Sequence, residues 1–123
     1  MELIERMTPD FSFPDERGLL VQIAHDNFRQ VNAVFTKQGA VRGNFHYHKE
    51  TDEVFFVLSG RVRVTAGKDG RTQEAVFGAG EMFRIGAWVR HSFAYLEDTS
   101  LVVLYSVPVE RADGTKDIYT DGV

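Results

Sequence analysis

The apolar residues of this chain occur in short runs, and this pattern limits the possible folds more than any other feature. The runs are five to eight residues long, rich in Val, Phe and Tyr, and separated by Gly, Asp or Pro. Such runs at intervals of about eight to twelve residues are typical of all-β sandwiches and barrels. No stretch keeps a 3.6-residue apolar period long enough to predict a helix. The expected strands are Leu19–Ile23, Val31–Thr36, Asn44–His48, Val54–Leu58, Arg61–Ala66, Thr72–Phe77, Glu81–Ile85, Val89–Leu96 and Leu101–Val107.

Nine to eleven short strands without helices have to close or stack, because free strand edges pair with other chains. We therefore expect a jelly roll or a small barrel. An immunoglobulin-like sandwich is disfavoured, since the chain lacks the Cys and Trp core pattern of that fold. The 123 residues are expected to form a single domain, residues 1–123. Its barrel core would span about 17–108, and the polar tail at about 110–123 is expected to be an arm or a frayed end.

The charge and residue content exclude several classes of partner. Lys and Arg number 14 against 18 Asp and Glu, a formal net charge of −4, which leaves no basic surface for nucleic acid or anionic membranes. The longest uninterrupted apolar runs are about five residues, far below the roughly 20 that a membrane helix needs. The chain has no cysteine, so thiolate metal sites and disulfides are excluded. We expect a cytoplasmic protein whose partner is a small molecule.

Three of the four histidines fall into two of the expected strands. His46 and His48 are two residues apart, a spacing that places both on one face of a strand. Glu53 begins the next strand, and His91 lies in a later one. Continued alternation puts large apolar residues on the same faces as these polar groups, so the polar groups need buried partners. We interpret the set as a site for one divalent metal ion (Zn, Mn, Fe, Ni or Co) rather than as scattered surface histidines.

The same residues resemble the cupin superfamily. Residues 46–60 carry the pattern His-x-His-x4-Glu-x6-Gly, which is similar to its first motif, and residues 80–91 carry Gly-x5-Gly-x4-His, which is similar to its second. The resemblance covers about Gly39 to Tyr95. It implies an all-β cupin jelly-roll barrel, also described as a double-stranded β-helix. Carried over residue by residue, it implies metal ligation by His46, His48, Glu53 and His91.

The sequence departs from the cupin pattern at a few positions around these ligands. One extra residue separates Gly39 from His46, which predicts an insertion or bulge at Phe45. In the second motif, Gly86 stands where Pro is usual, Trp88 where Gly is usual, and Tyr95 where Asn is usual. Every ligand position is kept, so these departures concern the turn shape and the pocket more than the metal.

The segments 14–18 and 42–44 resemble cupins that epimerise or isomerise nucleotide sugars. In such enzymes a histidine acts as the base, but a histidine whose lone pair binds a metal cannot also accept a proton. We therefore expect a metal-dependent sugar or sugar-nucleotide isomerase or epimerase, in which Tyr95 moves the proton. A mononuclear non-haem dioxygenase and a non-catalytic small-ligand sensor are the alternatives.

Strand alternation also predicts the residues around a ligand. Asn44, Phe55 and Phe93 share the inward faces of the metal ligands and are predicted to contact the substrate. A slip of register at Phe45 would reverse the direction of Asn44. No cofactor besides the metal ion is expected. The strand Val54–Leu58 is apolar at every position, so its outward face needs a second sheet or a second subunit. We expect a homodimer, as the resemblance also suggests.

Overall fold

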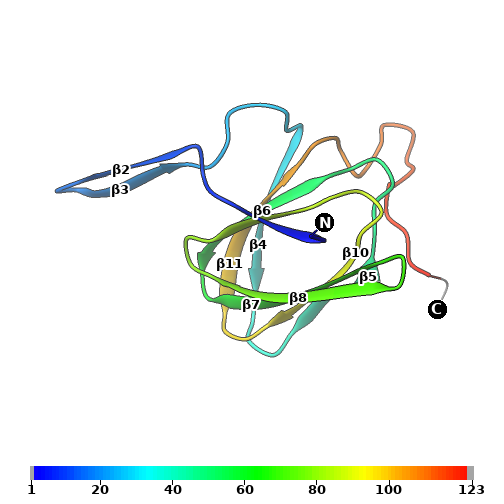
Figure 1. Cartoon of the computed structure of the whole chain (residues 1–123). Coiled ribbons are helices and arrows are strands. Elements are labelled where there is room, and N and C mark those ends of the chain that lie inside the picture. The colour runs from blue at the N-terminus through cyan, green and yellow to red at the C-terminus, as the bar shows by residue number, and fades with distance from the viewer. Residues whose placement is uncertain (1, 122–123) are drawn as a thin grey trace.

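The computed structural model describes residues 2–121, and these residues form eleven strands and no helix (Figure 1). None of them therefore belongs to a helix able to cross a membrane. The strands are β1 (Ile4–Met7), β2 (Phe11–Asp15), β3 (Gly18–Gln22), β4 (Gln30–Thr36), β5 (Val41–His46), β6 (Glu53–Ser59), β7 (Arg61–Lys68), β8 (Arg71–Gly78), β9 (Met82–Ile85), β10 (Arg90–Tyr95) and β11 (Thr99–Tyr105).

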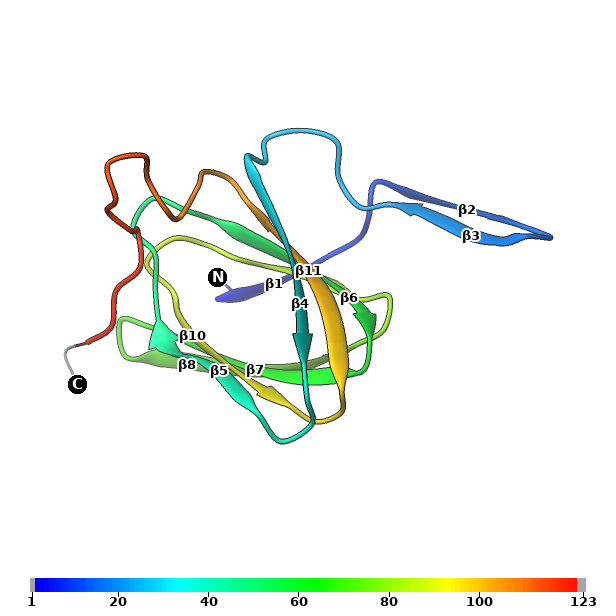
Figure 2. The same cartoon turned by 180° about the vertical axis from the view of Figure 1, so that it is seen from behind.

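Two antiparallel sheets face each other and enclose the interior (Figures 1 and 2). The larger sheet has the strand order β1-β9-β6-β11-β4, and the smaller has the order β5-β10-β7-β8. Strands that are neighbours in space are often distant in sequence, as in a jelly roll. The all-β jelly-roll prediction is confirmed. The nine expected strands correspond to β3–β11, whereas β1 and β2 were not expected, because their sequences IERM and FSFPD carry little apolar alternation.

Aromatic side chains fill part of the interior between the sheets. The rings of Phe77 and Phe83 stack with centroids 4.1 Å apart, and Phe55 stacks on Phe83 at 4.8 Å. Phe93 completes the cluster, with its ring centroid 4.9 Å from that of Phe55. Burying a ring of this size contributes roughly 1.5 to 3 kcal/mol, so this cluster stabilises the sheet pair without help from a ligand. Phe55 and Phe93 also form the floor of the pocket described below.

The outward face of β6 is covered mainly by the same chain. Val54 and Phe56 are buried, and with Met82 and Leu104 they form a second apolar cluster on the outside of the larger sheet. Side chains from the end of β3 and the segment after it pack on this cluster; they are Val21, Ile23, Ala24 and Phe28. Leu58 remains 50% exposed. Most of the cover expected from a second subunit is therefore supplied by residues 21–28.

The hairpin formed by β2 and β3 projects away from both sheets (Figures 1 and 2). Its turn is fixed by Asp15, whose carboxylate accepts a hydrogen bond from the Arg17 amide at 2.8 Å. At the other end of the molecule, the described part of the polar tail does not fray. Residues 109–121 contact the main body through hydrogen bonds and an ion pair, and residues 122–123 lie outside the described range.

Candidate metal centre and pocket

A distorted stretch of backbone at the end of β5 sets the direction of His46. Gly43, Asn44 and Phe45 all have positive φ, at 100°, 45° and 53°. Left-handed φ costs non-glycine residues about 1 to 2 kcal/mol each, so such a run needs support from its surroundings. The pairing of β10 with β5 shifts register here, and His46 ends opposite His91. The bulge expected at Phe45 is therefore present, and it aims His46 inward.

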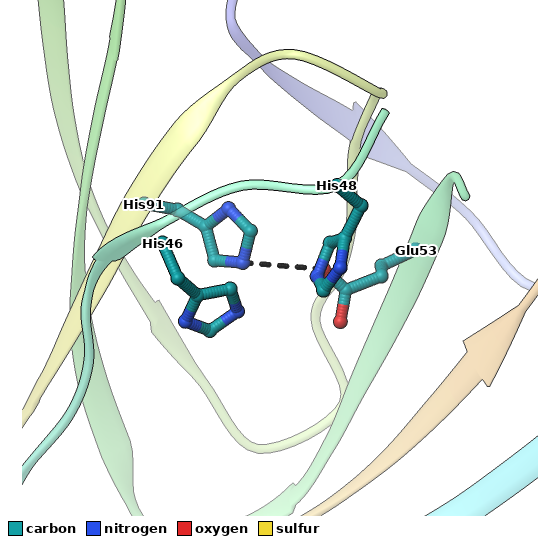
Figure 3. Close-up of side chains that lie close together, drawn as sticks. All are labelled: His46, His48, Glu53 and His91. Atoms are coloured by element: carbon teal, nitrogen blue, oxygen red, sulfur yellow. Dashed lines mark ion pairs between the residues drawn. The ribbon is translucent and has the colours of Figure 1, made fainter. Parts of the chain in front are cut away.

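All four predicted ligands meet at one point inside the molecule (Figure 3). His46 ends β5, His48 follows it outside the strand, Glu53 begins β6 and His91 lies in β10. Their candidate ligand atoms all lie within 4.8 Å of one another. Ligand atoms bound at about 2.1 Å to one ion lie at most about 4.2 Å apart, so roughly half an ångström of side-chain movement suffices.

Backbone carbonyls fix the tautomer of each imidazole. The Nδ1 atom of His46 donates to the Gly43 carbonyl at 2.6 Å, that of His48 to Asp117 at 2.6 Å, and that of His91 to Val89 at 3.0 Å. A carbonyl oxygen only accepts, so the hydrogen of each neutral ring is on Nδ1. Each Nε2 then carries its lone pair toward the centre of the cluster. This is the arrangement that metal-binding histidines adopt.

The centre of the cluster contains polar atoms that lack partners. His48 Nε2 and His91 Nε2 lie 2.9 Å and 3.1 Å from Glu53 Oε1. Among residues 2–121, however, neither His48 Nε2 nor Glu53 Oε1 has a hydrogen bond of acceptable direction. Glu53 is only 4% exposed, and a buried carboxylate without a partner is strongly destabilising. A divalent cation between these atoms satisfies both, so the donor set fits a metal ion.

The electrostatics of the cluster favour an ionised Glu53 carboxylate and a neutral His46 imidazole. Burial raises the pKa of Glu53, but its contacts with His48 and His91 outweigh burial and lower that pKa to about 2. Burial lowers the pKa of His46 to about 4, and the neighbouring His91 adds to the effect. Burial also disfavours the charged form of His48, yet Glu53 outweighs it and raises the pKa of His48. A cation and a proton on His48 therefore serve the same purpose, which is to balance the charge of Glu53.

A cavity of about 230 Å³ lies beside the four ligands, between the two sheets. Phe55, Phe93 and Tyr95 line it, as predicted. Asn44 does not reach it, because the bulge at 43–45 breaks the strand alternation that placed Asn44 inward. Asn44 is exposed, and Gly43 lines the cavity in its place.

Tyr95 lies deep in the pocket but far along β10 from the ligands. It is 3% exposed, and burial raises the pKa of its hydroxyl, although a hydrogen bond with Thr36 and the charge of Arg42 oppose this. Four residues of strand separate it from His91, which corresponds to about 13 Å between the Cα atoms. A ligand that touches both the cluster and Tyr95 has to span that distance.

Sequence reasoning missed a second tyrosine that is closer to the ligands. Tyr105 in β11 is the register partner of Glu53 and lines the cavity. Its hydroxyl accepts a hydrogen bond from Asn32 Nδ2 at 3.3 Å. Burial and the charge of Glu53 raise the pKa of Tyr105 to about 12. The alternation Leu101, Val103, Tyr105 within the predicted strand was the available signal for its inward direction.

Comparison with known proteins identifies the family. The model of the family described as "Cupin domain" matches residues 34–107, which is more than half of the chain. The search among curated proteins found no match. Many solved structures are similar in fold.

Three solved structures illustrate this similarity. QdtA, a sugar 3,4-ketoisomerase from Thermoanaerobacterium thermosaccharolyticum in complex with TDP, has a TM-score of 0.80 and 18% identity, over 98% of this chain and 89% of that one. The TDP-quinovose 3,4-ketoisomerase WlaRB from Campylobacter jejuni has a TM-score of 0.79 and 18% identity, over 95% and 94%. A dTDP-4-dehydrorhamnose 3,5-epimerase from Sulfolobus tokodaii has a TM-score of 0.69 and 24% identity, over 85% and 75%.

These identities are low, so the solved structures establish only a shared fold. The matched family model covers β5, β6 and β10, the strands from which the histidine and glutamate ligands arise. It also covers residues 61–79, the 19 residues between the two sequence motifs, and most of the pocket walls. The chain belongs to the cupin family.

Proposed function

We propose that this chain is a metal-dependent enzyme that isomerises or epimerises a sugar or a sugar nucleotide. The observation that carries the proposal is the convergence of four candidate ligand atoms within 4.8 Å of one another at the wall of a pocket. The solved structures with this fold support the class of substrate, because they include sugar ketoisomerases and an epimerase that act on TDP-linked sugars.

The size of the pocket suits one sugar ring. A volume of about 230 Å³ is enough for a monosaccharide ring. In our proposal the sugar ring enters the pocket and any nucleotide stays outside. Arg42 lines the pocket, and its guanidinium donates to Thr36 Oγ1 and the Phe35 carbonyl, which hold it in place for an anionic group.

The residues of the site have separate roles in this reaction. His46, His48, Glu53 and His91 would hold the ion, which when bound supplies Lewis acidity to polarise a sugar carbonyl. With their Nε2 lone pairs engaged, these histidines are not available as bases. Tyr95 and Tyr105 have raised pKa values because they are buried, so both keep their proton at neutral pH and serve as donors.

The reaction class is tested by proton exchange. The metal-loaded protein is incubated in ²H₂O with a TDP-linked 4-keto sugar and, separately, with free monosaccharides, and deuterium at the sugar carbons is followed by NMR. We expect metal-dependent exchange at a carbon next to the carbonyl. Substrate-dependent O₂ uptake with iron in place of exchange contradicts the isomerase and supports the dioxygenase. Tight binding without either reaction supports a ligand sensor.

The two tyrosines are separated by their phenylalanine variants. If Tyr105 is the proton donor, Tyr105→Phe lowers the exchange rate by about 10²- to 10⁴-fold, while Tyr95→Phe changes it only several-fold. The reverse order assigns the donor to Tyr95. Both variants keep the aromatic ring, so the metal content and the thermal midpoint serve as controls and should match the wild type. Equal and small effects of both variants exclude a tyrosine donor.

A homodimer is the assembly we propose, and the β2–β3 hairpin supports it. An isolated two-stranded hairpin is marginal in water, yet this one presents Phe13 and Leu20 at more than half exposure. β4 is the edge of the larger sheet and exposes Val31 at 64% and Phe35 at 69%. The exposed area of these and neighbouring apolar side chains amounts to several hundred Å² per copy, on the order of a standard interface. We propose that each hairpin packs on β4 of the second copy.

Sedimentation velocity at concentrations of about 10 µM and above tests the dimer, since interfaces of standard size dissociate at micromolar concentrations or lower. We expect a dimer for the wild type and a monomer for Phe13→Lys. Phe13 touches little of its own chain, so this variant should fold. Val76→Lys, on the exposed face of β8, is the matched control and should stay dimeric. A monomeric wild type contradicts the proposal.

A further inference from the structure

The last described part of the chain runs beside the metal ligands, on the side of the molecule away from the hairpin (Figures 1 and 2). We call residues 109–121 the C-terminal strap. Tyr119 and Tyr47 exchange two backbone hydrogen bonds, at 2.9 Å and 3.0 Å. Arg90 forms an ion pair with Asp121, and the Lys49 ammonium lies 4.2 Å from the centroid of the Tyr119 ring. The strap is therefore fastened directly to the residue between His46 and His48.

Asp117 is the residue of the strap that reaches furthest into the molecule. It is 5% exposed, and its carboxylate accepts hydrogen bonds from the Lys49 amide at 2.8 Å, the Glu50 amide at 2.9 Å and the Thr51 hydroxyl at 2.8 Å. These three donors belong to the short connection between His48 and Glu53. The carboxylate thus holds the loop that joins two of the four candidate ligands.

The backbone carbonyl of the same residue contacts His48 itself, accepting its Nδ1 hydrogen at 2.6 Å. The other two histidines donate to carbonyls two or three residues away in their own segments, so their orientation is local. The acceptor for His48 is 69 residues away. The direction of one ligand therefore depends on where the strap lies.

We propose that Asp117 is a positioning residue for the metal centre. Its carbonyl fixes the tautomer and orientation of His48, and its carboxylate holds the loop that sets His48 against Glu53. The proposal rests on the metal site that is part of the proposed function. Outer partners of this kind, when removed, weaken metal binding by about 10- to 100-fold. The strap also supplies Val109, Glu110 and Ile118 to the wall of the pocket, so the same segment borders both metal and substrate.

The test compares Asp117→Asn and Asp117→Ala in the full chain. Metal affinity is measured by competition of Zn²⁺ and Co²⁺ with a chelator, and the visible absorption of bound Co²⁺ reports the ligand geometry. We expect Asp117→Ala to bind about 10- to 100-fold more weakly with an altered Co²⁺ spectrum. Asp117→Asn keeps the shape and one acceptor oxygen but turns an NH₂ group toward the Glu50 amide, so its metal affinity should fall several-fold, between those of the wild type and Asp117→Ala. Asp113→Asn is the control, because its carboxylate bonds only to Thr115 in an exposed turn, and it should behave as wild type.

The outcomes separate this inference from the proposed function. If the wild type binds Co²⁺ but both Asp117 variants show the wild-type affinity and spectrum, the Asp117 carboxylate does not position His48 through the loop, and the metal site stands. If the wild type binds no divalent ion, both proposals fail. If Asp117→Ala does not fold, Asp117→Asn is the deciding variant. A metal affinity, Co²⁺ spectrum and thermal midpoint equal to those of the wild type in Asp117→Asn overturn the positioning role of the carboxylate.

Discussion

His91→Ala is expected to lower the bound divalent metal from about one ion per chain to less than about 0.1 after gel filtration. The imidazole is 3% exposed, and its Nε2 lies 3.1 Å from Glu53 Oε1, so its loss opens the centre of the cluster. The remaining donors, two imidazoles and a carboxylate, still attract a cation but hold it too weakly to survive dilution. Elemental analysis of protein purified without added metal gives the readout.

His25→Ala is the matched control for this experiment. His25 is the fourth histidine of the chain, but it is exposed and pairs with Asp10 at 2.7 Å, away from the cluster. Its variant should keep the wild-type metal content, which excludes adventitious binding to surface imidazoles. A metal-free wild type, or His91→Ala with an undiminished content, contradicts the metal centre. If no metal ion is bound, protonated His48 and Glu53 form a buried ion pair on their own.

Much of the candidate metal cluster was predictable from short sequence spacings. His46 and His48 are two residues apart, Glu53 opens the next apolar run, and the family pattern fixes His91 relative to its glycines. Strand alternation also placed Phe55 and Phe93 correctly in the pocket. These inferences need only the period of a regular strand, and in β6 and β10 the period is kept.

The predictions were wrong where the backbone departs from the two-residue period of a regular strand. Asn44 was expected inward, but two consecutive non-glycine residues in left-handed conformation reverse its direction. The extra residue before His46 signalled a bulge but not the direction in which each side chain would turn. β1 was missed because it pairs with β9, more than 70 residues away, and gains its burial only there. Such long-range pairing leaves no trace in a local pattern.

The tail at about 110–123 was expected to be an arm or a frayed end because its composition is polar. Its attachment rests on backbone groups, as in the pairs of Tyr47 with Tyr119 and of His48 with Asp117. Every residue but proline carries the same backbone donors and acceptors, so the sequence does not reveal where they pair. The buried carboxylate of Asp117 also depends on this arrangement, and in the sequence it is one of many acidic residues.

Gly60→Ala is expected to cost about 2 to 5 kcal/mol of the free energy of unfolding. Gly60 joins β6 to β7 with φ at 90°, a conformation that alanine adopts only with strain. An added Cβ would lie 2.7 Å from the Thr99 Cα atom and closer still to the Asp98 carbonyl oxygen. Both are backbone atoms at the start of β11, so relief requires moving a strand of the larger sheet. Against a total stability of about 5 to 15 kcal/mol, the loss is large.

Gly80→Ala separates the two causes of this loss. Gly80 has nearly the same φ, 83°, but nothing lies within 4 Å of an added Cβ. Its variant should lose only the conformational part, about 1 to 2 kcal/mol, in urea unfolding with an unchanged dependence on denaturant. Equal losses of unfolding free energy in Gly60→Ala and Gly80→Ala contradict the close approach of the turn at Gly60 to β11. Gly60 lies seven residues of strand beyond Glu53, which places their Cα atoms about 23 Å apart. Any Gly60→Ala protein that remains folded should therefore bind metal as the wild type does, which makes the last glycine of the first motif a requirement of the fold and not of the metal centre.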